Sequence, residues 1–249
     1  MEAGMKLFDD RICHLTFSHT DCADVWKLYV PQMRTHFSVG MAHYVAVNQV
    51  HPELPETVKP LIYEEGRPYP QRLLACLKAL EEYEFVFFDH EDMFLYAAPD
   101  YQKLAKYYEF MQSGQFDHIR LIKGGDCQYE PVPACPTLYS LSLKSKWIFS
   151  IQPSFWRRTV LMDVLKANLK VNIWELEVNS QKVVRKMGLK AAFSYRSGKR
   201  RGLHHFDNDV YPYVATAIGK GKWNLGEYGV ELEPLLEQYQ IDPTRRGWF

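Results

Sequence analysis

Apolar and polar residues follow two patterns along the chain: short apolar runs and longer stretches with helical spacing. The strongest run, Phe85–Phe88, has four consecutive apolar residues, which predicts a strand buried on both faces of a sheet. The segment before it, residues 69–83, places Leu73, Leu77 and Leu80 on one face of a predicted helix. Alternation of strands and helices is typical of a mostly parallel sheet with right-handed crossovers. The pattern therefore predicts an α/β fold.

The other segments repeat one of these two patterns. In the first half we expect strands at 11–17, 43–50, 61–63 and 117–122, and helices at 24–37 and 99–113. In the second half we expect a hairpin of strands at 139–143 and 147–151, and helices at 155–169, 172–187 and 232–239. The pattern weakens beyond Ala191, and residues 197–209 have the composition of a loop.

Composition narrows the class of protein. The 249 residues are 47% hydrophobic and 24% charged, as in ordinary globular proteins. The net charge of zero argues against nucleic acid as a partner, since bulk nucleic-acid binding leaves a basic footprint. Five cysteines without a CxxC pair favour reduced thiols in a cytosolic protein. We find no signal-peptide pattern and no apolar run of about 18 residues, so we expect a cytoplasmic protein without a transmembrane segment.

Carboxylates follow the Phe85–Phe88 run directly, at Asp89, Glu91 and Asp92. Carboxylates at the end of a buried strand are costly unless a cation or hydrogen bonds compensate them. Ligands of open α/β sheets bind at the carboxyl ends of the strands. The cluster therefore predicts a divalent cation that holds a phosphorylated ligand, with Asp89 and Glu91 as oxygen ligands. A solvated acidic turn that caps a helix is the alternative.

This layout resembles the GT-A fold of nucleotide-sugar-dependent glycosyltransferases. The segment Asp89-His90-Glu91 is similar to the DxD motif, which in that group holds Mn²⁺ or Mg²⁺ on the donor diphosphate. Glu stands here at the second acidic position, so Glu91 or Asp92 could be the second contact. The segments SIQPSFWRR (150–158) and NIWELE (172–177) resemble acceptor-side motifs of small viral and bacterial sugar transferases.

The resemblance implies a GT-A-like (Rossmann-like) domain with a mostly parallel central sheet flanked by helices. It implies a nucleotide-sugar-binding half at about 10–125 and a smaller acceptor-binding half at about 126–249. The implied activity is metal-dependent transfer of a sugar from a nucleotide-diphosphate sugar to a hydroxyl acceptor such as a glycan. The implied cofactor is Mn²⁺ or Mg²⁺, and the implied location is the cytosol, that of the host if the protein is viral.

Donor contacts are expected near the acidic cluster. Thr16, Ser18 and His19 lie at the end of the first strand and would be beside Asp89 if the two strands are neighbours. There they could contact the base or ribose of the nucleotide, and His90 within the motif is grouped with them. Ordinary helix capping is the alternative for the three residues after the first strand.

Four basic residues are candidates for contacts with the diphosphate. Arg67 and Arg72 flank the start of the predicted helix before the acidic strand, where a guanidinium could reach phosphate oxygens. Lys199 and Arg201 lie in a loop that could close over the diphosphate as a lid. Surface salt bridges and a solvated basic loop are the alternatives.

An inverting transferase needs a general base, and Glu175 is the first candidate. A carboxylate beside Trp174 is expected to be partly desolvated, which would raise its pKa toward a useful range. Glu177 is the second candidate. The alternative for Glu175 is a stabilising role at the N-terminus of a helix. A plausible base slightly favours inversion.

Two further sets of site residues are predicted, one that contacts the metal and one that contacts the acceptor. His204 and His205 lie in the segment HHFDND, and by resemblance to GT-A enzymes one of them could complete the shell of the metal. A solvated loop is the alternative. The predicted acceptor contacts are Gln152, Ser154, Trp156 and Trp174, although a tryptophan placed like Trp156 is more often a core residue.

Two rival functions remain open. A metal-dependent phosphohydrolase or nuclease could use the acidic cluster with His204 and His205 in a two-metal arrangement. A carbohydrate-binding module could hold Ca²⁺ structurally with the same acids, but such modules are usually all-β, which the strand–helix alternation disfavours.

Overall fold

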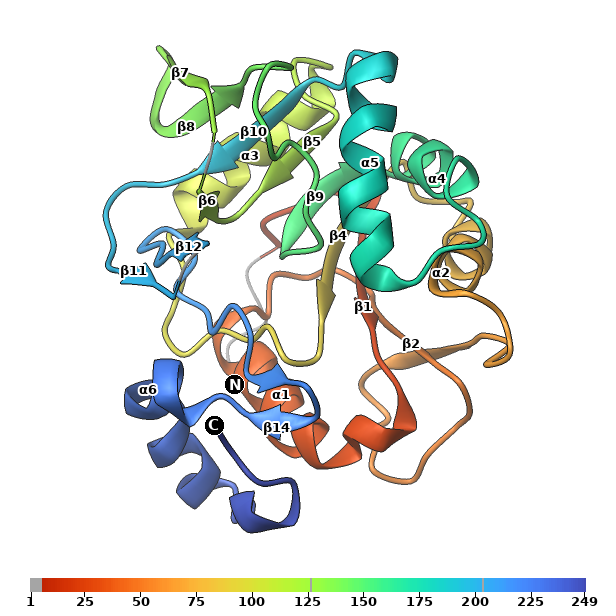
Figure 1. The fold of residues 1–249 in the computed structure, drawn as a ribbon, viewed down its shortest axis with the longest axis vertical. Coiled ribbons are helices and arrows are strands. Elements are labelled where there is room, and N and C mark those ends of the chain that lie inside the picture. Colours follow the sequence, from red (N-terminus) through yellow and green to blue (C-terminus); the bar gives the residue numbers. More distant parts are fainter. Residues whose placement is uncertain (1–5, 126, 203) are drawn as a thin grey trace.

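The computed structural model describes residues 6–125, 127–202 and 204–249. Within these residues a nine-stranded sheet has the order β3-β2-β1-β4-β9-β5-β10-β8-β7 (Figure 1). Its strands are β1 (Ile12–Phe17), β2 (His43–Val47), β3 (Lys59–Ile62), β4 (Phe85–His90), β5 (His118–Arg120), β7 (Tyr129–Val132), β8 (Cys135–Leu141), β9 (Ser154–Arg157) and β10 (Ala191–Ser194). In this sheet only β8 and β9 run against the other described strands. The predicted α/β fold with a mostly parallel sheet is confirmed.

Helices cover both faces of the sheet. On one face lie α2 (Tyr69–Lys78), α4 (Arg158–Lys166) and α5 (Ile173–Met187), which contact one another on the right of Figure 1. Residues of α1 (Ala23–His36), α3 (Tyr101–Gln112) and α6 (Leu225–Gln238) belong to the core on the other face. Phe85 and Phe87 of β4 point into this second core, while Val86 and Phe88 point into the first. The central strand is therefore buried on both faces, as its apolar run predicted.

Short elements complete the described chain. The strands β11 (Arg200–Arg201), β12 (His205–Phe206) and β6 (Lys123–Gly124) form a small sheet, and β13 (Ile218–Gly219) pairs with β14 (Lys222–Trp223). The 3₁₀ helices are η1 (Thr20–Cys22) and η2 (Pro243–Arg245). No helix of the described residues is long and apolar enough to cross a membrane.

Three predictions of secondary structure were wrong. Residues 154–157 form β9 instead of the start of a helix, because Phe155 and Trp156 bury their side chains in opposite cores between β4 and β5. The hairpin is formed by β7 and β8, while residues 147–151 form no strand. The segment of weak pattern after residue 190 contains β10, an interior strand of the sheet. For β9 and β10, pairing with strands distant in sequence overrides local preference.

The strand order places several chain segments at one edge of the sheet. The order reverses between β1 and β4, since β2 and β3 lie on one side of β1 and β4 on the other. Such a reversal creates a crevice at the carboxyl ends of the strands. Because β9 is antiparallel to β4 and β5, its amino end, and the loop before it, also reach this edge.

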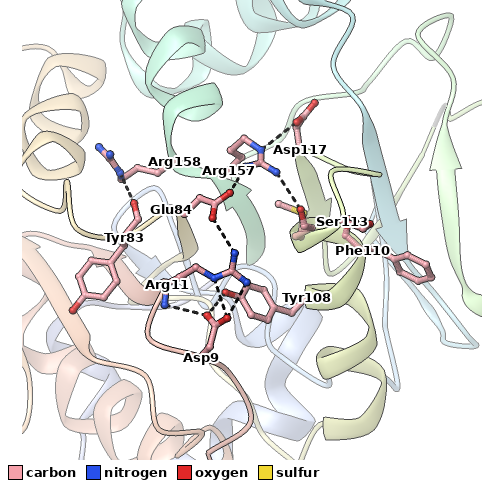
Figure 2. Close-up of polar contacts among 11 residues, drawn as sticks. Asp9, Arg11, Tyr83, Glu84, Tyr108, Phe110, Ser113, Asp117, Arg157 and Arg158 are labelled. Carbon is pink, nitrogen blue, oxygen red and sulfur yellow. Dashed lines mark hydrogen bonds and ion pairs between the residues drawn. The ribbon is translucent and has the colours of Figure 1, made fainter.

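The opposite edge of the sheet is held by charged side chains (Figure 2). Glu84 precedes β4 and accepts hydrogen bonds from Arg11 at 3.2 Å and from Arg157 at the end of β9. Arg157 also lies 3.6 Å from Asp117, which precedes β5. Arg158 donates to the carbonyl of Tyr83 at 2.7 Å. These contacts tie β1, β4, β9 and β5 together far from their carboxyl edge.

Replacing Glu84 with alanine is expected to lower the free energy of unfolding by about 1 kcal/mol, because Glu84 pairs with two arginines but is half exposed and screened by solvent. Urea unfolding followed by circular dichroism measures the change. Glu82→Ala is the matched control, since Glu82 is an exposed neighbour on the same turn. A loss for Glu84→Ala no larger than that of the control would contradict this role.

Candidate functional site

A pocket of about 610 Å³ opens at the carboxyl edge of the sheet. It is lined by the end of β4, the end of β5, the loop before β9, the first turns of α5 and the β11–β12 hairpin. The pocket therefore draws on both predicted halves of the chain. The residues predicted from the sequence that line it are His90, Gln152, Trp174, Glu177, His204 and His205.

The start of α5 is fixed by a capping box. The side chain of Asn172 accepts a hydrogen bond from the backbone N–H of Glu175, and the Glu175 carboxylate accepts one from the backbone N–H of Asn172, both at 2.9 Å. Trp174 follows at the mouth of the pocket, where 75% of its surface is exposed. Glu175 does not line this pocket, so the geometry supports the capping alternative for Glu175.

Glu177 lies two residues beyond Glu175 on α5, on a different side of the helix, and does line the pocket. Its carboxylate accepts a hydrogen bond from the backbone N–H of Ile151 at 2.6 Å. Gln181, one turn later, accepts from the N–H groups of Ile148 and Phe149. These two side chains hold the backbone of the loop before β9, which explains why that loop is not a strand.

Burial raises the pKa of the Glu177 carboxyl above its usual value, although the Ile151 N–H and the charge of Arg120 act against the rise. A carboxylate with a raised pKa is a better proton acceptor once it is ionised. Of the two carboxylates predicted as candidate bases, only Glu177 lines the pocket.

Arg120 was not predicted as a site residue. It ends β5 in the pocket and is fully buried. Its Nη2 donates to the Cys127 thiol at 2.9 Å and its Nη1 to the Trp147 carbonyl at 3.5 Å, while Nε has no hydrogen-bond partner among the described residues. The available signal in the sequence was an arginine inside the apolar strand segment HIRLI (118–122).

Two further buried polar atoms of the pocket residues, Ser150 Oγ and His90 Nδ1, lack a partner within the described part of the chain. The other ring nitrogen of His90 lies 3.0 Å from the hydroxyl of Tyr69. Burial lowers the pKa of His90 to about 3, so its imidazole is neutral near pH 7. A ligand in the pocket could satisfy both atoms, since buried polar groups are usually hydrogen-bonded.

Asp89 does not line the pocket but lies in an internal hydrogen-bond network. Its carboxyl oxygens lie 2.9 and 3.0 Å from the hydroxyl of Tyr29, and one of them lies 2.9 Å from His14 Nε2. Thr16 Oγ1 joins the network through Tyr29 at 2.6 Å and His43 at 2.8 Å. Burial raises the pKa of Asp89 to about 7. This placement speaks against the predicted contacts of Asp89 with the metal and the donor, and of Thr16 with the nucleotide.

Glu91 and Asp92 come directly after β4 in the sequence, close to the point where the strand order reverses between β1 and β4. Glu91 lies beside Ser18 and Cys22, and the Asp92 carboxylate accepts a hydrogen bond from the Ile218 N–H at 3.4 Å. Burial raises the pKa of both carboxyls, that of Asp92 to about 8, and the charge of Glu91 adds to the rise at Asp92. A cation between them would favour their charged forms. Two carboxylates are the number that Mg²⁺ usually takes from a protein.

Across residues 6–125, 127–202 and 204–249, no group of three or more His, Cys, Asp or Glu side chains is arranged to hold a metal ion. His204 and His205 line the pocket, and burial lowers the pKa of His205 to about 4. The structure therefore does not bring both predicted histidines and the acids into one ready-made set of ligands.

The remaining donor-side candidates have structural partners. Ser18 Oγ accepts from the indole N–H of Trp26 at 2.7 Å, and His19 caps η1. Arg67 pairs with Glu64 at 2.8 Å, which is the salt bridge left open as an alternative. Arg72 lies over the ring of Tyr63 at 5.4 Å, outside the main pocket.

Four further candidates lie outside the pocket lining: Lys199, Arg201, Ser154 and Trp156. Lys199 is exposed, and Arg201 pairs with Asp207 and Glu231. Ser154 donates to the carbonyl of Gln152 at 2.8 Å. Trp156 is a core residue that stacks on His118, with ring centroids 3.8 Å apart.

No family model matches the chain, and no curated protein matches it either. Among solved structures, CMP:2-keto-3-deoxy-manno-octonic acid synthetase complexed with CTP has a TM-score of 0.47 and 10% identity, covering 74% of this chain and 88% of that chain. A nucleotidyl transferase from Methanothermobacter has a TM-score of 0.45 and 13% identity, covering 76% and 89%. Mannose-1-phosphate geranyltransferase from Thermus thermophilus has a TM-score of 0.41 and 10% identity, covering 82% and 76%. Similarities of this size identify no activity, so the function must be inferred from the pocket.

Replacing Asp89 with asparagine is expected to change how stability depends on pH. The folded-state pKa of Asp89 is raised to about 7, so its contribution is fully present below the unfolded pKa of about 4 and is lost as the pH rises through 7. Relative to wild type, Asp89→Asn should gain about 2 to 3 kcal/mol in unfolding free energy between pH 5 and pH 8.

Urea unfolding at several pH values measures this difference. Asp163→Asn is the control, because Asp163 is exposed and lies 2.8 Å from Lys166 on the surface of α4. A constant difference between wild type and Asp89→Asn across this range would show that Asp89 does not titrate as its burial requires.

Proposed function

We propose that the protein is a glycosyltransferase that moves a sugar from a nucleotide-diphosphate sugar to a hydroxyl group of an acceptor such as a glycan. The observation that carries this proposal is the placement of Glu177, a largely buried carboxylate with a raised pKa, in a pocket at the carboxyl edge of the sheet. An exposed tryptophan, Trp174, lies at the mouth of the same pocket.

The number of carboxylates favours transfer over glycoside hydrolysis. Most glycosidases flank the scissile bond with two carboxyl groups, one of which protonates the leaving group. Among the described residues that line the pocket, Glu177 is the only carboxylate. A nucleoside diphosphate is a far better leaving group than a sugar hydroxyl, so one base is sufficient for a displacement that inverts the sugar carbon.

The chain's own residues suit the acceptor side of this reaction. Trp174 offers a flat apolar surface to a sugar ring. The Gln152 side-chain oxygen accepts from the Tyr213 hydroxyl at 2.8 Å, which leaves its amide group to donate to a sugar hydroxyl. Glu177, oriented by the Ile151 N–H, would take the proton from the attacking hydroxyl.

Glu91 and Asp92 are the residues that would hold Mn²⁺ or Mg²⁺, since burial raises the pKa of both carboxyls, and neighbouring carboxylates add to the rise. Such an ion would neutralise charge on the departing diphosphate. His204 or His205 could add a ligand from the pocket side, as the resemblance to GT-A enzymes suggests. Asp89 is left to its internal network.

The rival functions have less support. A two-metal phosphohydrolase or nuclease would need Asp89 as a ligand, but its oxygens bond Tyr29 and His14. A carbohydrate-binding module of the all-β kind does not agree with the mostly parallel sheet.

Replacing Glu177 with glutamine is expected to lower turnover by a factor of about 100 or more, because the amide cannot accept the proton. Wild-type turnover should rise with pH through the raised pKa of Glu177, since only the ionised form is a base. Release of nucleoside diphosphate from a panel of nucleotide sugars, with mixed glycan acceptors, measures both effects.

Glu175→Gln is the matched control for this experiment, since Glu175 lies on the same helix but caps it. It should retain turnover and lose at most about 1 kcal/mol of stability. The Glu177→Gln variant should still bind the nucleotide sugar, as measured by the thermal shift. Full turnover in Glu177→Gln would remove Glu177 from the reaction.

Replacing Glu91 with glutamine or Asp92 with asparagine is expected to abolish the part of the nucleotide-sugar thermal shift that depends on Mn²⁺. The reason is that a bound ligand stabilises the folded state by mass action, and each variant removes one of two carboxylates. Thermal shifts measured with Mn²⁺ and with a chelator test this, with Asp163→Asn as the control. An undiminished Mn²⁺ effect in both variants would exclude these residues as ligands.

A further inference from the structure

The deep end of the pocket holds a positive charge that no carboxylate of the described residues contacts directly. Arg120 is fully buried, and an arginine remains charged at any pH that a folded protein experiences. No carboxylate of the described residues lies within 4.0 Å of its guanidinium. Arg157, Arg201 and Arg246 are less buried, and each of them contacts at least one carboxylate.

A buried charge without a partner lowers stability, since its loss of hydration is not recovered. Within the described chain Arg120 lies over the ring of Phe193, 5.7 Å from its centroid, and its hydrogen-bond partners are a thiol and, at 3.5 Å, a carbonyl. Both are weak acceptors for a charged donor at these distances, and Nε has no acceptor at all within that part of the chain. A purely structural role does not account for this arrangement.

The atoms around Arg120 form a set suited to an anion. Ser150 Oγ and His90 Nδ1 line the same pocket and also lack partners among the described residues. Ser150 and His90 are 7% and 8% exposed, so water reaches them poorly. Gly124 closes one side: a Cβ there would lie 3.3 Å from Nη2 of Arg120. The guanidinium and the serine hydroxyl can both donate to oxygens of one ligand group.

We infer that the acceptor sugar carries a negatively charged group, a carboxylate or a phosphate, that binds Arg120. The assignment to the acceptor rests on the proposed function, in which Glu177 activates the acceptor hydroxyl. Arg120 and Glu177 line the same pocket and interact electrostatically, whereas Glu91 and Asp92 do not line it and lie beside Ser18 and Ile218, where the strand order reverses. The anion is therefore at the reacting hydroxyl and not at the departing diphosphate.

Binding of the anion would also prepare the base. The charge of Arg120 lowers the pKa of Glu177, which weakens it as a proton acceptor. A carboxylate or phosphate on Arg120 would cancel that charge and raise the pKa again. Glu177 would then be strongest as a base when the correct acceptor is in place.

The test compares free sugars by saturation-transfer NMR titration on the full chain, without any nucleotide. The probes are glucuronate and glucose 6-phosphate against glucose, with inorganic pyrophosphate as a separate arm. Wild type should bind at least one of the two acidic sugars about 10- to 100-fold more tightly than glucose, as expected for hydrogen bonds to a charged group. Arg120→Met should remove this preference, and Arg34→Met, at an exposed position of α1, should keep it.

Stability and thiol labelling separate binding from a structural role. Without ligand, Arg120→Met should unfold at the same or a higher temperature than wild type, because it removes an unpaired buried charge. In wild type the acidic sugar should slow alkylation of Cys127, whose thiol is 2.9 Å from Arg120 Nη2, with Cys22 as the reference. The labelling result does not depend on the variant being folded.

Three results would overturn the inference: equal binding of acidic and neutral sugars, a preference that survives in Arg120→Met, or pyrophosphate as the only ligand that depends on Arg120. Tighter binding of glucuronate would indicate a carboxylate on the acceptor sugar, and tighter binding of glucose 6-phosphate would indicate a phosphate. Failure of the proposed function can be distinguished from failure of this inference. Acid-sugar binding through Arg120 without turnover of any nucleotide sugar would refute the transferase, while transfer to neutral acceptors without the preference would refute only this inference.

Discussion

Several ionisable side chains are buried at the carboxyl edge of the sheet. The cost of removing them from water is the constraint on which the rest of this structure depends. The carboxyl ends of β1, β4 and β5 meet there because the strand order reverses between β1 and β4. Asp89, Glu91 and Arg120 all lie at this edge with little or no contact with solvent. Each must recover the free energy of its lost hydration from hydrogen bonds, a change of protonation or a ligand.

The protein meets this requirement in two different ways within a few residues. Asp89 is satisfied by side chains of its own chain, which places it in the interior together with His14 and Tyr29. Arg120 and Ser150 keep unpaired atoms that face the pocket. The first arrangement completes the hydrogen bonds of Asp89 within the fold, and the second leaves polar atoms in the pocket that a ligand could bind. The difference between neighbouring polar residues is thus whether the fold or a ligand completes their hydrogen bonds.

Sequence reasoning found the strand at the centre and the region of the site, but not the orientation of individual side chains. The apolar run before Asp89 identified β4, because consecutive apolar residues in a strand indicate that both of its faces are buried. The strand β9 was missed because it has only four residues. Its conformation is determined by pairing with β4 and β5, which lie far away in sequence, and not by a local pattern. Glu175 and Glu177 are two positions apart on a helix, so they point in different directions, and only the capping geometry of Asn172 decides which one faces the pocket. Arg120 had no motif, since its meaning lies in the absence of a carboxylate among its described neighbours.

The antiparallel entry of β9 has a consequence for how this site could change over evolution. The segment of residues 146–153 arrives at the carboxyl edge as a loop held by three side chains of α5, Glu177, Gln181 and Arg185, rather than by ladder pairing. Its sequence could therefore be exchanged while the sheet and the opposite charged edge stay intact. Exchange of this one loop would change the lining of the pocket, while the three α5 side chains could hold the new backbone in the same place.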